Sequence, residues 1–225
     1  MRASPTLLER AEAAAALVAA LGEMESAGRN IVTALVDGQD FVTETHYPAD
    51  DALDPHTRAQ YYFHAHRGAA ESGHIHCYLR GEGTSNLTHV LAIALDHFGR
   101  PAQFFTTNLW VTADNWLPAE ALIPQLPRLA WRDAPAPAAV NQALTALCVL
   151  YRREIAALLR RRDKRLARHA AASQADALAD EALEILSRAR INLPGTLARL
   201  RQSLNLPETD DAAEPASGGH HSPGR

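Results

Sequence analysis

Residues 61–80 have the sequence YYFHAHRGAAESGHIHCYLR, two runs of alternating residues joined by a short segment of Gly, Ala, Glu and Ser. Side chains on a β-strand point alternately to opposite faces, so the alternation predicts an antiparallel hairpin with one apolar and one polar face. The polar face receives four histidines, which are His64, His66, His74 and His76. We take this hairpin as the centre of the fold and extend the interpretation outward from it.

The four histidines are candidate metal ligands. A turn at the middle of the connecting segment would place His66 opposite His74. The other two, His64 and His76, would then also face each other. Directly opposed Cβ atoms are about 4.5–5.5 Å apart, which would let several ring nitrogens converge on one ion. Imidazoles, with Glu71 as a weaker ligand, suit a divalent transition metal, so the expected cofactor is Zn, Fe or Mn.

Two other interpretations of the histidines remain open at this stage. The hairpin could form a metal-free polar pocket for a small molecule, or only a polar sheet face. Neutral imidazoles need hydrogen-bond partners and protonated ones repel each other, so two His-x-His pairs in register favour a functional site. The sequence contains no glycine-rich phosphate loop, and therefore no nucleotide cofactor is indicated.

Further candidate residues lie around the histidines. Residues 87–96 form the next expected strand, in which Ala92 and Ala94 share the histidine side and leave room for a ligand, while His89 falls on the leucine face. A catalytic role is considered for Arg80, Asp96, Tyr62 and Tyr78. Weaker ligand-binding candidates are His46, Thr106 and Asn108. There is no nucleophile elbow and no H-E-x-x-H, so the reaction, if there is one, is not identified.

The rest of the chain predicts an α+β fold with an N-terminal helix, an antiparallel β-meander of about six strands and a helical C-terminal region. The helix is expected from Ser4, as the N-cap, to Gly28. Strands are expected at 30–36 and 41–47 around the turn-like pair Asp37-Gly38, followed by four more through residue 111. Helices are expected at 118–125, 136–169, 174–190 and 195–204. The expected divisions are a domain at 4–165, a helical extension at 166–205 and a disordered tail at 206–225.

The amino-acid composition limits the classes of protein to which the chain can belong. The chain has 225 residues, 47% of them hydrophobic and 21% charged, with a net charge of −4. These are values of a globular protein with no overall attraction to nucleic acid or membrane. Its two cysteines cannot form a disulfide framework, and charged residues interrupt the apolar N-terminal stretch. We therefore expect a soluble cytoplasmic protein that binds neither a membrane nor nucleic acid.

A basic segment supports a second class of function. Residues 152–168 contain eight cations and two acidic residues; the cations are Arg152, Arg153, Arg160, Arg161, Arg162, Lys164, Arg165 and Arg168. A helix of this kind can bind an acidic partner, although a solvated helix face explains it as well. The alternative to a metal or small-molecule site is thus a structural or regulatory module acting through its C-terminal helices, as a homo-oligomer or with an acidic partner.

Several motifs together are similar to an uncharacterised bacterial domain family of unknown function. They are HYP at 46–48, YYFHAHR at 61–67, E-x-G-H-x-H at 71–76 with LR at 79–80, and FTTNLWVT at 105–112. The resemblance covers about residues 5–165 and implies a shared domain without a known activity. A shorter motif, His64-x-His66 followed after four residues by Glu71, resembles the first metal motif of the cupin superfamily, but the helices around the sheet argue against a plain jelly roll.

Overall fold

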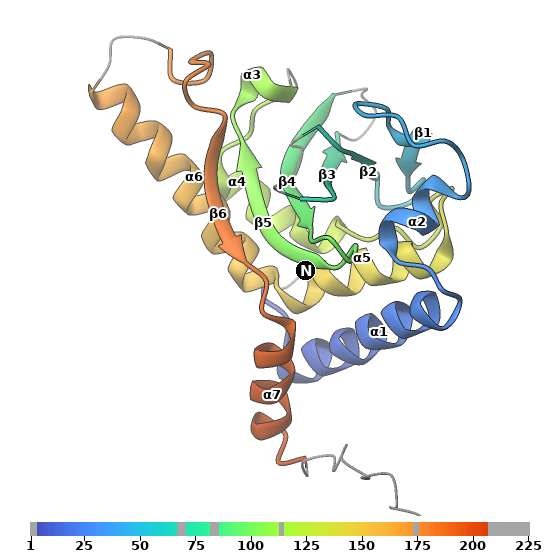
Figure 1. The fold of residues 1–225 in the computed structure, drawn as a ribbon. Helices are drawn as coiled ribbons and strands as arrows, with labels where there is room; N and C mark the ends of the chain where they lie inside the picture. Colours follow the sequence, from blue (N-terminus) through green and yellow to red (C-terminus); the bar gives the residue numbers. More distant parts are fainter. Residues whose placement is uncertain (1–3, 67–70, 82–85, 113–114, 173–175, 207–225) are drawn as a thin grey trace, which may run out of the picture. The chain divides into compact units, whose positions relative to one another are not determined.

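A computed structural model of the chain describes residues 4–66, 71–81, 86–112, 115–172 and 176–206. It confirms the α+β class and the antiparallel meander. Six strands form one sheet in the order β1-β2-β3-β4-β5-β6, and each strand is antiparallel to its neighbour (Figure 1). The strands are β1 (Tyr47–Leu53), β2 (Ala59–His64), β3 (Gly73–Arg80), β4 (Leu87–Leu95), β5 (Pro101–Thr107) and β6 (Ile185–Arg190).

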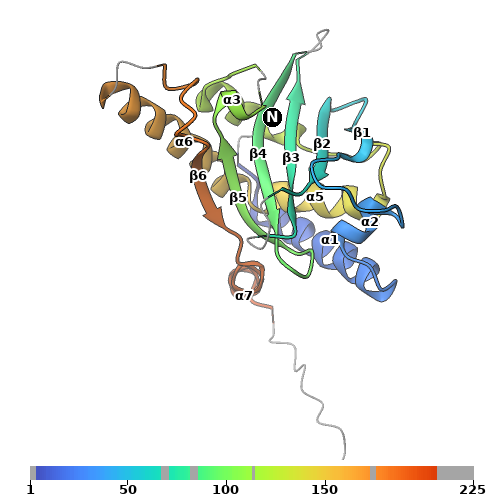
Figure 2. The same ribbon diagram turned by 45° about the horizontal axis from the view of Figure 1, so that its top comes forward.

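Helices cover one face of the sheet. The helices that precede α7 (Leu193–Ser203) along the chain are α1 (Leu7–Ser26), α2 (Ile31–Val36), α3 (Leu109–Thr112), α4 (Ala119–Leu122) with the 3-10 turn Ile123–Arg128, α5 (Ala138–Leu150) and α6 (Arg152–Ala172). From β2, the Tyr61 hydroxyl donates a hydrogen bond to Asn141 of α5. From β6, the Ser187 hydroxyl donates to the Leu158 carbonyl of α6. Helix α1 packs along α5 (Figure 2), so the sheet is covered first by α5 and α6.

The N-terminal helix forms as predicted, with a different first residue. Thr6, rather than Ser4, is the N-cap, and its side chain accepts a hydrogen bond from the backbone of Glu9 while the Glu9 side chain accepts one from Thr6. This reciprocal capping box satisfies two helix N–H groups that would otherwise lack partners. Buried Ala13 and Leu17 then let α1 approach α5 closely.

The strand expected at 30–36 is wrong, because these residues form α2. Asn30 is its N-cap, and the Asn30 and Thr33 side chains each accept a hydrogen bond from the other's backbone N–H. Asp37 ends the helix in the left-handed conformation instead of making a hairpin turn. Local capping therefore overrides the β-branched composition that favoured a strand. The strand expected at 41–47 is also displaced, since β1 begins at Tyr47.

The helix expected at 174–190 is wrong as well. Residues 185–190 form β6, which pairs with β5 and completes the six-stranded sheet. The hydrogen bonds that make β6 a strand are formed with β5, about eighty residues earlier in the chain. The sequence pattern within residues 185–190 does not indicate this distant partner. The long helix expected at 136–169 is divided at Tyr151 into α5 and α6.

The chain divides into two compact units, residues 1–192 and 193–225. The described part of the second unit contains α7 (Leu193–Ser203), which agrees with the helix expected at 195–204. The division expected at residue 165 stays a prediction. The tail expected at 206–225 lies, beyond Leu206, outside the described residues. None of the helices within the described ranges combines the length and apolar character needed to span a membrane.

Candidate metal centre

The hairpin of β2 and β3 carries the histidines in a register two residues away from the predicted one. His64 lies opposite His74, and Tyr62 lies opposite His76. The expected pairs His66–His74 and His64–His76 are therefore wrong. The connection between the two strands is longer than predicted and begins before His66. His66 therefore lies beyond the paired part of β2. The strand parity is nevertheless correct, because a shift of two residues keeps each side chain on its face.

Three histidines converge at the end of this hairpin. One ring nitrogen from each of His64, His66 and His74 lies within 4.8 Å of the others. The Nε2 atoms of His64 and His74 are 2.9 Å apart. Two nitrogens that bind one ion at about 2.1 Å are about 3 Å apart when they subtend a right angle, so this spacing suits two ligands of a common ion. His74 is buried, His64 is half-buried and His66 is exposed.

Glu71 orients one of these rings. Its carboxylate accepts a hydrogen bond from Nδ1 of His74. A proton held at Nδ1 leaves Nε2 as the lone-pair nitrogen that faces the other histidines. Metal-binding histidines are commonly held by a carboxylate in this way. Glu71 therefore lies behind the histidine cluster as a partner of His74.

A glycine permits the close packing beside His74. Gly73 has a φ of +125°, a conformation that L side chains rarely adopt. A Cβ at this position would lie 2.6 Å from the His64 carbonyl oxygen and 2.5 Å from the Phe63 ring. Glycine is thus required where β3 begins, directly before the buried ligand candidate.

A second row of polar side chains continues inward from the cluster. His76 Nδ1 and His89 Nε2 are 3.0 Å apart, and the Thr107 hydroxyl lies 3.2 Å from His89 Nδ1. The sequence placed His89 on the leucine face, which is wrong. Tyr78 pairs with His89 while Cys77 pairs with Leu91, so a bulge at this point turns His89 to the histidine side. His76, one of the four predicted ligands, belongs to this row.

Burial keeps His89 neutral. Desolvation is the first cause that lowers its pKa, and the nearby positive charge of Arg162 adds to it, so that the pKa is about 3. At neutral pH the ring therefore carries one proton, so it donates to one of its two partners, His76 and Thr107, and accepts from the other. His89 is the member of this face that sequence reasoning missed, because only the bulge reveals its side.

Small residues border the histidines as expected. Ala94 lies opposite His74 and Ala92 lies opposite His76. Both are buried and pack with Phe105 of β5. The Phe105 ring contacts His74 at a centroid distance of 5.3 Å.

Two tyrosines and His46 extend the polar face toward β1. The hydroxyl groups of Tyr62 and Tyr78 are 2.9 Å apart. The His46 ring stacks on Tyr62 with a centroid distance of 3.6 Å, and its Nδ1 lies 2.9 Å from an Asp51 carboxylate oxygen. The structure therefore brings three of the predicted side chains, His46, Tyr62 and Tyr78, to the histidine face.

The other candidates make contacts elsewhere. Arg80 lies on the histidine face but at the far end of β3, where its Nε donates to the side chain of Gln60, the residue opposite Tyr78. Asp96 accepts hydrogen bonds from the backbone N–H groups of Phe98 and Arg100, so it caps the turn between β4 and β5. Neither contact reaches the three converging histidines.

Thr106 and Asn108 are buried and bonded within the protein. The Thr106 hydroxyl lies 2.7 Å from that of Ser187, toward α6, on the face opposite Phe105. The Asn108 amide donates to the Ala177 carbonyl oxygen. The structure therefore places both residues apart from the histidine cluster. Arg67, the last residue of the YYFHAHR motif, lies outside the described residues.

A cavity of about 520 Å³ adjoins the open side of the cluster. His66 and Glu71 line it together with Phe41, Thr43, Glu44, Ala65, Ser72 and His97. It is large enough for a small molecule and contains both polar and aromatic side chains. The exposed ligand candidate His66 therefore connects the histidines with a space that a small ligand could enter.

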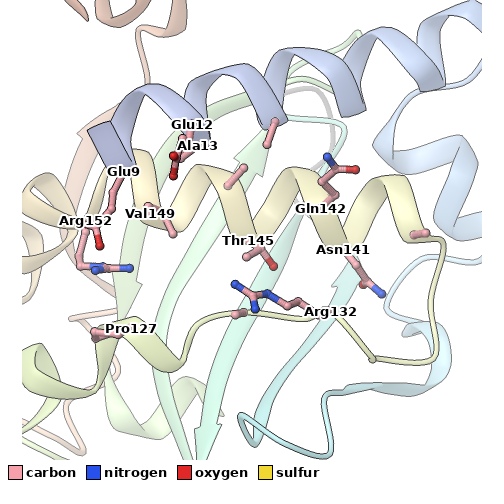
Figure 3. Close-up of a pocket in the computed structure, with 14 residues that line it drawn as sticks. Glu9, Glu12, Ala13, Pro127, Arg132, Asn141, Gln142, Thr145, Val149 and Arg152 are labelled. Atoms are coloured by element: carbon pink, nitrogen blue, oxygen red, sulfur yellow. The ribbon is translucent and has the colours of Figure 1, made fainter. Parts of the chain in front are cut away.

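Another cavity, of about 600 Å³, lies between α1 and α5 and contains none of the predicted site residues (Figure 3). Glu9 and Glu12 of α1 and the cations Arg132 and Arg152 line it together with small apolar residues. Opposite charges therefore balance in this cavity. Its side chains offer no group of metal-binding nitrogens.

The fold and the site together define an α+β domain whose sheet presents a cluster of histidines on one face. The chain belongs to a family described as a domain of unknown function, DUF6969, which matches residues 11–191. This match confirms the resemblance found in the sequence and extends it beyond residue 165, through β6. No curated protein and no solved structure matches the chain. A cupin-like jelly roll is not observed, because the described strands form one continuous meander.

Proposed function

We propose that this domain binds one divalent transition metal ion through His64, His66 and His74. The observation that carries the proposal is the convergence of three ring nitrogens within 4.8 Å, with the buried His74 held by Glu71. Imidazole nitrogens bind Zn, Fe and Mn at about 2.0–2.2 Å, and a group of three leaves coordination positions for a further ligand.

The arrangement of protons supports binding at Nε2 of His74 and His64. Because Glu71 accepts the Nδ1 proton of His74, His74 Nε2 is an acceptor, and His64 Nε2 donates to it across 2.9 Å in the metal-free protein. Metal binding at His64 Nε2 would require this proton to move to Nδ1 of the same ring, since a neutral imidazole binds a metal through the nitrogen that offers its lone pair. A small rotation of each ring would then open the space between the two nitrogens.

The adjoining cavity supports a site at which a small molecule meets the metal. His66 is exposed on the cavity side, and Glu44 and His97 line the same cavity. A metal with an open position supplies Lewis acidity to a bound carbonyl or water. In that arrangement Glu44 and His97 would bind and orient the ligand. The second row, His76, His89 and Thr107, would hold the inner side of the cluster in place.

Metal analysis of the untagged protein tests the proposal. After reconstitution with Zn, Fe(II) or Mn and removal of free ions, we expect about one ion per chain by mass spectrometry. The exposed His66 can be changed without disturbing the core, so His66→Ala should abolish or strongly weaken retention while circular dichroism stays unchanged. Glu71→Gln should weaken affinity by about 10–100-fold, because it removes the carboxylate that holds His74.

His56→Ala is the matched control. His56 is an exposed histidine whose ring lies 3.8 Å from the Asp133 carboxylate, away from the cluster. The His56→Ala protein should retain as much metal as the wild type. Wild-type protein that retains none of the three metals, or His66→Ala protein that retains as much as the wild type, contradicts the proposal.

A further inference from the structure

Helix α6 carries many cations, and two of them pair with carboxylates. Arg160 forms two hydrogen bonds with the Glu120 carboxylate on the surface. Arg162 is buried, pairs with Asp163 and lies 4.0 Å from the Trp116 ring centroid. These contacts join α6 to the segment that contains α4. The fold therefore accounts for Arg160 and Arg162.

Four other cations of α6 gather on a different side of the helix. Each of Arg161, Lys164, Arg165 and Arg168 lies three or four residues from two others of the set, as in the pairs 161/164, 161/165, 164/168 and 165/168, so they share one helix face. All four are exposed. Together with Arg188 of β6 they line a groove of about 560 Å³, here called the basic groove. Ile185, Leu186 and Ser187 complete its lining.

Contacts between α6 and β6 shape the groove. The Arg161 guanidinium donates to the Arg188 carbonyl oxygen at 3.4 Å. The Arg188 guanidinium donates to the Gln103 side chain at 3.4 Å, which leaves its charge on the surface. Because β6 is the last strand of the sheet, the basic groove runs along an edge of the sheet that no other described strand covers.

The charge of the basic groove is uncompensated by its own lining. Five cations line it, and none of the described lining residues is Asp or Glu. In the cavity between α1 and α5, by contrast, two carboxylates accompany two arginines. Like charges three and four residues apart destabilise a helix, so such a concentration favours a bound anion over a purely structural role.

We propose that the basic groove binds a small polyanion that carries several phosphate groups. Guanidinium groups match phosphate oxygens with paired hydrogen bonds, and four of the five cations are arginines. The volume of the groove suits a small molecule. A long nucleic acid fits less well, because the chain as a whole has a net charge of −4. This binding is independent of the metal proposed at the histidines.

Calorimetric titration of the full chain with inorganic tripolyphosphate tests the inference. At low ionic strength we expect saturable binding to one site, which weakens as salt screens the charges. Arg165→Gln/Arg168→Gln protein should bind at least about tenfold more weakly, because two charge-assisted contacts are lost. Both residues are exposed, so the fold should be unaffected.

A matched variant distinguishes the effect of the basic groove on binding from the effect of overall net charge. Arg29→Gln/Arg100→Gln changes the net charge equally, and both arginines form exposed ion pairs elsewhere. This protein, and His66→Ala protein, should bind tripolyphosphate as the wild type does. Absence of binding by the wild type, or equal weakening in both double variants, overturns the inference. Tighter binding of a single-stranded oligonucleotide than of tripolyphosphate would also overturn it, by assigning the groove to nucleic acid.

Discussion

The two faces of the β2–β3 hairpin are both buried, and they differ in how burial is achieved. On the helix-covered face, Tyr61, Phe63 and Ile75 are fully buried among apolar neighbours. On the other face, His74 is 1% exposed and His76 is 3% exposed, so these polar rings are nearly as inaccessible. One sheet therefore has an apolar core on one side and a polar core on the other.

The two faces contribute differently to stability and to the positioning of side chains. Apolar packing is non-directional and stabilises in proportion to the area removed from water. A buried imidazole gains little unless both ring nitrogens have partners, and here the partners are Glu71, His89 and Thr107. The helix-covered face thus holds the fold together, while the histidine face positions nitrogens.

The largest expected difference is in stability. Phe63→Ala should lower the free energy of unfolding by about 3–5 kcal/mol, because it leaves a cavity in the helix-covered core. His66→Ala, at an exposed position of the histidine face, should change it by less than about 0.5 kcal/mol. Urea denaturation without added metal measures both. Similar losses for the two variants would contradict the division of roles.

The next largest expected effect is a loss of stability at acidic pH. Because the pKa of His89 is lowered from 6.5 to about 3, the unfolded chain binds a proton below pH 6.5 that the folded chain does not bind until about pH 3. Stability contributed by neutral His89 is therefore present above pH 6.5 and is lost as pH falls toward 3. The loss should approach about 1.4 kcal/mol per pH unit below pH 6.

His89→Gln provides the comparison for this pH effect. Glutamine can still hydrogen-bond to His76 and Thr107 but does not titrate in this range. Denaturation in the presence of a chelator, from pH 7 to pH 4, should show a shallower loss for the variant than for the wild type. Equal slopes would contradict a neutral, buried His89. Constant NMR shifts of its ring protons between pH 7 and 4 would support it without any substitution.

The sequence predicted the faces of the hairpin well because alternation is a local property of a strand. The side of each histidine in β2 and β3 follows from parity alone, and an even-numbered shift in register preserves it. The partners were mispredicted, since the conformation of the connection decides which residues face each other. His89 was missed for a related reason, because one bulge in β4 reverses the side of every residue before it.

The ends of the sheet were harder to predict than its centre. The segment at 31–36 is rich in β-branched residues, but capping by Asn30 and Thr33 makes it a helix. The segment at 185–190 becomes a strand because β5 offers it hydrogen bonds. In both cases a specific hydrogen-bonded contact decides the secondary structure. The periodicity of the sequence indicates only which side chains are apolar.

The smallest expected difference comes from two neighbouring tyrosines on opposite faces. Tyr61→Phe removes the hydrogen bond to Asn141 and leaves that buried amide oxygen with one fewer donor, which should cost about 1–3 kcal/mol. Tyr62→Phe removes the bond to Tyr78 at a half-buried position and should cost about 0.5–1.5 kcal/mol. Urea denaturation of both variants, and of the double variant, measures the two effects. The residues lie on opposite sides of the sheet, so their costs should add. A larger loss from Tyr62→Phe would mean that the histidine face contributes as much to folding as the helix-covered face.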